Sequence, residues 1–210
     1  MVTLSFDVML DFIGAFAFCL SGASVGSRHR MDFFGVFIMA VVTGFGGGCL
    51  RDIILGNNLP FLFRTPIYWI IACVATLIIF IPLSHKIVLR RITVNIFDAA
   101  GLAFFTVVGI KAGLANNLEA YQCIIMGVLT ACFGGVLRDI IVNQIPHLFQ
   151  REIYASISIV GGVLFFLLKP LVDSIYLEFL IIGFIFISRI FVMRFDLHLP
   201  KPKTRNKRSV

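Results

Sequence analysis

Long runs of apolar residues, separated by short polar or charged segments, recur along the whole chain. They cover approximately residues 5–26, 32–47, 66–84, 93–112, 118–135, 152–169 and 174–193. Each run approaches the roughly 20 residues that an α-helix needs to cross a bilayer. Because strands with alternating apolar and polar residues cannot be traced, a membrane barrel is disfavoured. The pattern predicts an all-α polytopic membrane protein with seven transmembrane helices.

The composition supports this prediction. Hydrophobic residues make up 59% of the 210 residues, charged residues make up 14%, and the mean hydropathy is +0.99. A soluble core of this size cannot bury that much apolar surface. The first apolar run has no basic stretch before it and no small-residue cleavage site, so we expect no removable signal peptide.

The basic residues predict the orientation in the membrane. With the N-terminus outside, thirteen of the 18 Lys and Arg residues fall on the inner side and four on the outer side, while Arg189 lies within the last helix. Because cytoplasmic loops are enriched in Lys and Arg, we expect a multi-pass inner-membrane protein with a cytoplasmic C-terminus. The acid-free tail from residue 201 supplies +5 of the net charge of +7. We expect this tail to contact membrane lipids rather than nucleic acid.

Residues that bind metals or perform catalysis form no recognisable constellation. The five cysteines contain no CxxC pair, and the four histidines are scattered, mostly at helix ends. Neither a nucleophile with its base nor a phosphate-binding loop is found. The sequence therefore predicts no enzyme, no metal site and no cofactor.

The chain contains an internal repeat. The segment GGCLRDII at 47–54 returns as GGVLRDII at 134–141, a spacing of 87 residues. The same spacing relates Asp11 to Asp98 and Thr43 to Thr130, and a spacing of 86 relates Tyr68 to Tyr154. Each copy holds three predicted helices, and an odd number makes the second copy enter the bilayer from the opposite side. We expect inverted repeats at 1–87 and 88–173, a seventh helix at 174–194 and a basic tail at 195–210.

Glycines precede the repeated Arg-Asp pair in both copies: Gly44, Gly46, Gly47 and Gly48 in the first, Gly134 and Gly135 in the second. Each glycine weakens a helix by about 1 kcal/mol relative to alanine. We therefore expect helices two and five to break or kink here, with a short continuation that carries Arg-Asp and ends near 57–60 or 143–146. Close helix packing through small residues is the alternative, and it is compatible with a kink.

The Arg-Asp pairs themselves are costly in hydrocarbon, so two copies suggest a polar route built from both repeats. Neighbouring residues on a helix point about 100° apart, so we expect Arg51 and Asp52 to pair with other groups. The candidates are the opposite pair, Arg138 and Asp139, or the two repeated aspartates Asp11 and Asp98. Structural ion pairing and direct lining of a polar path both remain open. For Asp11 a capping or interfacial role is favoured.

Charges near helix ends leave further alternatives. Lys111 ends the fourth helix, where a lysine usually reaches the headgroups, although its flanking glycines would let it swing toward a pore mouth. Glu178 and Arg189 lie eleven residues apart on one face of the seventh helix. We expect these two to stabilise the bundle or an interface.

The twin Gly-Gly-x-Leu-Arg-Asp motifs, the three-plus-three-plus-one arrangement and the segment Gly109-Ile110-Lys111-Ala112 resemble the bacterial trimeric intracellular cation (TRIC) channel family, over residues 5–194. The resemblance implies a homotrimer whose every subunit has a hydrophilic pore for monovalent cations, chiefly potassium, bounded by the glycine-broken helices. In the second copy Phe133 replaces the first glycine of the triplet, so the two kinks are not expected to be equal.

A cation path needs oxygens that replace part of the hydration shell, which Thr43, Thr130, Ser21, Ser24 and freed carbonyls could supply. The arginines suit such a path only if aspartates neutralise them, and a loose Arg-Asp pair could then gate it. The alternative function is secondary transport of a small amino acid such as glycine, with its carboxylate against an arginine and its amine against an aspartate. A purely structural membrane subunit is a third possibility.

Overall fold

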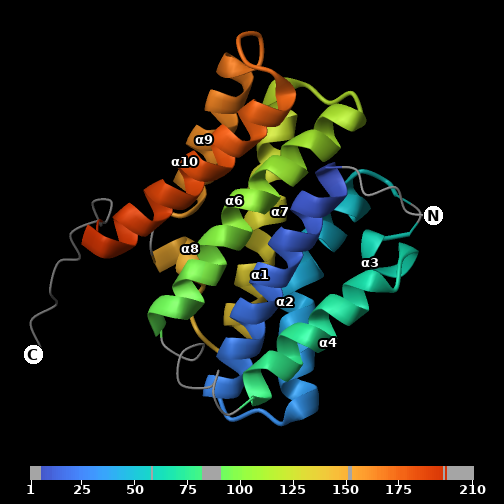
Figure 1. Ribbon diagram of the computed structural model, residues 1–210, viewed down its shortest axis with the longest axis vertical. Helices are drawn as coiled ribbons and strands as arrows, with labels where there is room; N and C mark the ends of the chain where they lie inside the picture. The colour runs from blue at the N-terminus through green and yellow to red at the C-terminus, as the bar shows by residue number, and fades with distance from the viewer. Residues whose placement is uncertain (1–5, 58, 82–90, 151–152, 196, 198–210) are drawn as a thin grey trace, which may run out of the picture.

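The computed structural model describes residues 6–57, 59–81, 91–150, 153–195 and 197, all of whose regular elements are α-helices. The residues on either side of the expected repeat boundary at 87/88, and the basic tail from 201, lie outside this described part. The long helices are α1 (Phe6–Arg28), α2 (Phe33–Ile54), α4 (Ile67–Phe80), α6 (Arg91–Ala115), α7 (Ala120–Ile141), α9 (Ala155–Leu168) and α10 (Ser174–Phe195) (Figure 1). Two short helices, α3 (Phe61–Arg64) and α8 (His147–Gln150), precede α4 and α9.

Five of these helices, α1, α2, α6, α7 and α10, are long and apolar enough to cross a membrane. Helices α4 and α9 are equally apolar but span only 14 residues each. At 1.5 Å per residue such a helix is about 21 Å long, against about 30 Å of hydrocarbon. They hold the third position of each repeat, where a short helix precedes both. The prediction of an all-α membrane protein with seven apolar helices, built from two repeats and one additional helix, is confirmed.

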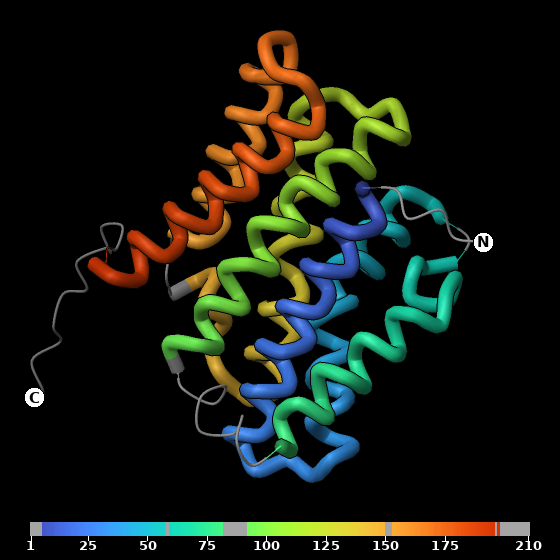
Figure 2. Tube along the Cα trace, in the orientation of Figure 1, coloured from blue at the N-terminus to red at the C-terminus, as the bar shows by residue number. Residues whose placement is uncertain are grey.

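The helices pack in the way that two inverted repeats require. Helices α1, α2, α6 and α7 form the core, with α1 against α6 and α2 against α7 (Figures 1 and 2). The start of α1 meets the end of α6, so these two equivalent helices run in opposite directions. Helix α4 packs on α1 and α2 as α9 packs on α6 and α7, while α10 lies outside this pairing, against α6 and α9.

The second helix of each repeat, α2 or α7, follows an acidic N-cap residue, and the two N-cap residues are equivalent under the repeat. The carboxylate of Asp32 accepts a hydrogen bond from the Gly35 amide at 2.7 Å, which satisfies one free N–H at the start of α2. At the start of α7, Glu119 and Gln122 form a capping box. In both repeats an acidic N-cap residue and its hydrogen bonds therefore fix where the second helix begins.

The helices are not interrupted at the glycines, so an expected break is wrong, whereas the expected kink stays a prediction. Helices α2 and α7 each continue through them without interruption, to Ile54 and Ile141. In hydrocarbon a helix keeps its backbone N–H and C=O groups paired internally, which favours an uninterrupted helix. The expected short continuation is the last turns of the same helix.

Close packing explains these glycines instead. A Cβ at Gly47 would lie 2.0 Å from the Thr130 carbonyl oxygen, and one at Gly134 would lie 2.1 Å from the Thr43 carbonyl oxygen. These reciprocal contacts are related by the repeat, and they bring α2 and α7 together at their crossing. Side chains limit the space at three of the others: Gly44 faces Cys19, Gly46 faces Leu137, and Gly48 faces Phe61.

Candidate functional site

Two polar cavities lie at opposite ends of the core. The first, of about 400 Å³, opens between the start of α1, the ends of α2 and α6, and α3; we call it the first vestibule. The second, of about 230 Å³, opens between the end of α1, the start of α6 and the end of α7; we call it the second vestibule. Ionisable residues line both: Asp11, Arg51, Asp52, Arg64 and Lys111 in the first, Arg28, His29, Asp98, Arg138, Asp139 and His147 in the second.

The two vestibules are counterparts under the internal repeat. Arg51, Asp52 and Asp11 in the first correspond to Arg138, Asp139 and Asp98 in the second, and we call these sets the first and second cluster. The sequence left open whether each Arg-Asp pair would lie near the opposite pair or near a repeated aspartate; in each vestibule it lies with the repeated aspartate of its own half. The threonines do not belong to either set.

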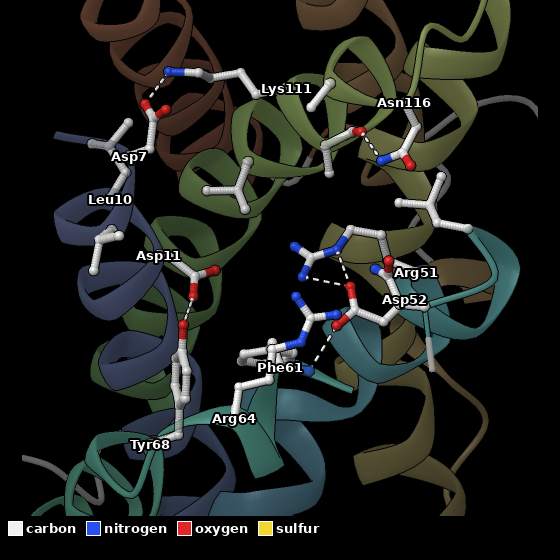
Figure 3. A pocket seen from close by; sticks show the side chains of 16 residues that line it. Asp7, Leu10, Asp11, Arg51, Asp52, Phe61, Arg64, Tyr68, Lys111 and Asn116 are labelled. Carbon is white, nitrogen blue, oxygen red and sulfur yellow. Dashed lines mark hydrogen bonds and ion pairs between the residues drawn. The ribbon is translucent and has the colours of Figure 1, made fainter. Parts of the chain in front are cut away.

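In the first cluster the arginine pairs with its own neighbour. The Nε of Arg51 donates to Asp52 Oδ1 at 3.0 Å, and its Nη2 lies 2.9 Å from the same oxygen (Figure 3). The second carboxylate oxygen of Asp52 accepts the backbone N–H of Phe61 at 2.7 Å, at the first residue of α3. The Arg51 guanidinium also lies over the Phe61 ring, 5.4 Å from its centroid. Asp52 therefore neutralises the arginine and holds the start of α3 together.

The second cluster repeats this pattern and adds two bonds. Arg138 Nε donates to Asp139 Oδ1 at 2.9 Å, and Asp139 Oδ2 accepts the backbone N–H of His147, the first residue of α8, at 2.9 Å. The Nη1 of Arg138 donates to Asp98 Oδ1 and to Ser21 Oγ, both at 2.7 Å. The expected pairing of the arginine with the repeated aspartate is confirmed here.

The expectation that adjacent Arg and Asp cannot pair is wrong in both copies. It considered where the two Cβ atoms point, but the long arginine side chain bends back along the helix to reach a carboxylate that the next short helix already holds. Both side chains are buried, with Arg51 at 7% and Arg138 at 3% exposure. An uncompensated buried charge is strongly destabilising, so the nearest carboxylate is used. The expected pairing across the two copies is also not made, since the clusters lie at opposite ends.

The two clusters differ in the bonds made by the aspartate from the first helix of each repeat, which is Asp11 in α1 and Asp98 in α6. Asp11 Oδ2 accepts the hydroxyl of Tyr68, and within the described part of the chain its Oδ1 has no hydrogen-bond partner. Figure 3 shows that carboxylate and the remaining nitrogen of Arg51 both facing the space of the first vestibule. Asp11 is buried within α1, so the favoured capping or interfacial role is wrong. Where Ser21 closes the second cluster, the equivalent residue in the first vestibule is Val108.

Lys111 neither reaches the headgroups alone nor stands free at a pore mouth. Its Nζ binds both Asp7 of α1 and Glu178 of α10 (Figure 3 shows the bond to Asp7). The repeat places Ser24 at the equivalent position, so this three-residue ionic group belongs to the first vestibule only. Sequence reasoning missed Asp7, because an exposed acid at a helix start resembles an ordinary dipole partner.

Of the hydroxyls expected along a polar path, those of Thr43 and Thr130 lie where α2 and α7 cross, whereas Ser21 and Ser24 belong to α1. Thr43 and Thr130 are both 1% exposed. Thr130 donates to the Met126 carbonyl at 2.6 Å, and Ser24 donates to the Leu20 carbonyl at 2.6 Å. Thr43 Oγ1 has no hydrogen-bond partner among the residues that the structure describes. Of the last two glycines, Gly134 meets the Thr43 carbonyl, whereas Gly135 faces Tyr154, Arg138 and Asp98 at ordinary contact distances of 3.5 to 3.7 Å.

Tyr68 and Phe61 were also missed, although the sequence contains a signal for them. Both belong to the segment that recurs at a spacing of 86, in which Tyr68 corresponds to Tyr154. A search of the ranges with described placement finds no group of three or more His, Cys, Asp or Glu side chains that could hold a metal ion. The site is therefore one of paired charges and hydroxyls.

Comparisons with known proteins agree with this architecture. A family model described as "Glycine transporter" matches the chain twice, over residues 8–84 and 95–170. These two matches start 87 residues apart, which is the spacing of the internal repeat. The chain therefore consists of two units of one family over most of its length.

Curated relatives and a solved structure extend the likeness. A UPF0126 membrane protein of Deinococcus radiodurans is 34% identical over 163 residues, which are 77% of this chain and 75% of the relative. The UPF0126 inner membrane protein YadS of Escherichia coli K12 is 36% identical over 156 residues, 73% of this chain and 74% of the relative. The structure of the TRIC trimeric intracellular cation channel orthologue from Rhodobacter sphaeroides superposes with a TM-score of 0.85 at 31% identity, covering 91% of this chain and 99% of that one.

Proposed function

The chain belongs to the prokaryotic TRIC channel family, the UPF0126 membrane proteins, and we propose that it is a monovalent cation channel of the inner membrane, chiefly for potassium. The pore runs within each subunit of a homotrimer. Channels, not enzymes, make up this family. The basic residues support an orientation with the first vestibule outside and the C-terminus in the cytoplasm.

The observation that carries the proposal is the pair of equivalent vestibules at opposite ends of one four-helix core. In this proposal a cation enters at one vestibule, passes the α2–α7 crossing and leaves at the other, and the crossing must open for the cation to pass. Thr43, Thr130 and Ser21 supply hydroxyl oxygens near this route. Oxygen ligands that replace part of a hydration shell are what a potassium ion requires.

Neutralised arginines make the route compatible with a cation. Each of Arg51 and Arg138 is bound by at least one carboxylate within 3.0 Å, so neither presents a full positive charge to the path. Desolvated charges interact far more strongly than charges in water, so loosening either pair would change the barrier for an ion. We propose that these pairs form the wall and the gate of the pore.

Reconstitution tests the function directly. Purified protein in planar bilayers should give unitary potassium currents, and a KCl gradient should shift the reversal potential toward the value for potassium. The gating role is tested by Arg51→Gln and Arg138→Gln, with Arg194→Gln, an exposed arginine of α10 that lines neither vestibule, as the control. Cluster substitutions that leave conductance and open probability at wild-type values would falsify the gating role. Native mass spectrometry in detergent tests the trimer.

A second candidate function, uptake of a small amino acid such as glycine, is favoured by one specific feature. In the first vestibule Arg51 and Arg64 offer nitrogens to a carboxylate, and Asp11 offers its second oxygen to an ammonium group. In the second vestibule the equivalent Arg138 is already bound to Asp98. Such a site lies in the first vestibule only, and the description of the family model names the same substrate class.

Flux measurements separate the two functions. Proteoliposomes are assayed in parallel for potassium flux and for uptake of labelled glycine. A channel gives unitary potassium current that saturates weakly, whereas a transporter gives saturable glycine uptake with counterflow. Asp11→Asn should abolish glycine uptake, and Asp98→Asn at the equivalent position should leave the glycine affinity unchanged.

A further inference from the structure

Helix α10, which has no counterpart in the repeat, inserts two charged residues of opposite sign into the bundle. Glu178 is 1% exposed and Arg189 is 4% exposed, so both face the protein rather than lipid. Eleven residues on an α-helix bring two side chains back to the same face, about 16 Å apart along the axis. Both charges therefore reach the core from one helix, near opposite ends.

The negative residue contacts the first vestibule. Glu178 binds Lys111, which lines this vestibule and also binds Asp7. Ser174 donates a further hydrogen bond to Glu178 at 3.1 Å. Because Asp7 alone would neutralise Lys111, the carboxylate of Glu178 leaves this group of three with one net negative charge.

The positive residue lies beside the second cluster. The Arg189 guanidinium lies over the ring of Tyr154, 4.6 Å from its centroid, and its Nη1 donates to the Ile153 carbonyl at 3.1 Å. Tyr154 shares a small cavity with Arg138 and Asp139. Arg189 is also close enough to Asp98 for a direct electrostatic interaction. It therefore adds its charge to the network that lines the second vestibule.

The two clusters are otherwise matched in formal charge. Each holds one arginine and two aspartates, as the internal repeat requires. Helix α10 contributes one negative charge at the first vestibule and one positive charge at the second. Among the other charged residues that line the vestibules, Lys111 and Asp7 cancel in the first, and Arg64 there is matched by Arg28 in the second. The difference in formal charge between the two ends of the core therefore comes from α10, the helix that the repeat does not contain.

We propose that Glu178 and Arg189 make the pore rectify, so that cations pass from the first vestibule to the second more easily than in reverse. This inference rests on the proposed channel function. Negative charge at a mouth raises the local concentration of cations, and positive charge lowers it. Both are positioning residues, because they act on the ion through the field and through Lys111 and Tyr154 rather than by contact.

Single-channel recording at equal and opposite voltages in symmetric KCl tests the proposal. The wild-type current from the first vestibule to the second should exceed the reverse current by about two- to fourfold, the size expected for unit charges near the path at a high effective dielectric. Glu178→Gln and Arg189→Gln should each move this ratio toward one, and the double variant should bring it close to one.

Three further variants sharpen the test. Arg194→Gln removes an exposed charge from the same helix and should leave the ratio unchanged. Arg189→Lys keeps the charge and should restore the wild-type ratio, which a purely structural role of the guanidinium would not predict. Asn116→Cys, at the first vestibule, lets a membrane-impermeant thiol reagent identify which side of the bilayer that vestibule faces.

The outcomes separate this inference from the function on which it rests. A wild-type protein without unitary currents refutes the channel function. Wild-type currents whose ratio neither glutamine variant alters refute the role of α10 and leave the channel function standing. If Arg189→Gln fails to fold, Glu178→Gln at the opposite vestibule still decides, because both substitutions should shift the ratio in the same direction.

Discussion

Replacing Gly134 by alanine places a methyl group in the contact between α2 and α7. The added Cβ would lie 2.1 Å from the Thr43 carbonyl oxygen, whereas ordinary contact begins at 3.4 Å. The difference, 3.4 − 2.1, requires a separation of about 1.3 Å from a backbone atom that cannot rotate away. Overpacking of this kind costs typically 1–3 kcal/mol, or more where backbone must move, and alanine recovers about 1 kcal/mol of helix propensity.

The neighbouring glycine supplies the matched control. A Cβ at Gly135 meets nothing closer than the Tyr154 hydroxyl at 3.5 Å, and one at Gly183 in α10 meets nothing within 4 Å. Both alanine variants should therefore be as stable as wild type or slightly more stable. Because the clash is with a backbone atom, the upper end of the overpacking cost applies, and Gly134→Ala should lower the free energy of unfolding by about 2 kcal/mol after the propensity gain is subtracted.

Thermal unfolding in detergent, followed by loss of the folded-protein peak in size-exclusion chromatography, measures these differences. The potassium flux of the same samples reports whether a wider α2–α7 crossing alters conduction. Should Gly134→Ala melt with or above the wild type, or should Gly135→Ala lose as much stability as Gly134→Ala, the close-packing account of these glycines is refuted.

Three further substitutions have defined outcomes. Asp52→Asn removes the carboxylate that Arg51 shares with the start of α3, and breaking this buried ion pair should cost about 3–5 kcal/mol in chemical unfolding. Asp32→Ala removes only a cap of α2 and should cost about 0.5–2 kcal/mol. Tyr68→Phe removes the hydroxyl bound to Asp11 and should cost about 1–3 kcal/mol while changing potassium conductance; an unchanged conductance would exclude Asp11 from the path.

Much of the fold could be predicted from the sequence because the internal repeat presents each residue pattern twice. The recurrence of Asp11 at Asp98, and of the Arg-Asp pair, indicated three equivalent helices in each half before any contact was known. For the glycines the sequence left a kink and close helix packing as alternatives, and the contacts of Gly47 and Gly134 confirm close packing. Which atoms Gly47 and Gly134 face depends on how α2 and α7 cross, and that angle is a property of the assembled core.

The candidate site could be predicted less completely. Charged residues in hydrocarbon identified Arg51 and Arg138 as central, but the reach of an arginine side chain and the position of α3 and α8 decided their partners. Glu178 and Arg189 have no equivalents in the repeat, so no second copy signalled where they lie. Their contacts depend on how α10 packs, which no local pattern encodes.

Ser21 and Val108 occupy equivalent positions, yet only Ser21 receives a hydrogen bond from an arginine. Two separate copies of a single three-helix protein, assembled head to tail, would have to carry the same residue at both places. Two copies joined in one chain need not be identical, because a substitution in one half leaves the other half unchanged. The serine therefore marks a divergence between the two halves, and it gives Arg138 a hydrogen-bond partner that Arg51 does not have at the equivalent position.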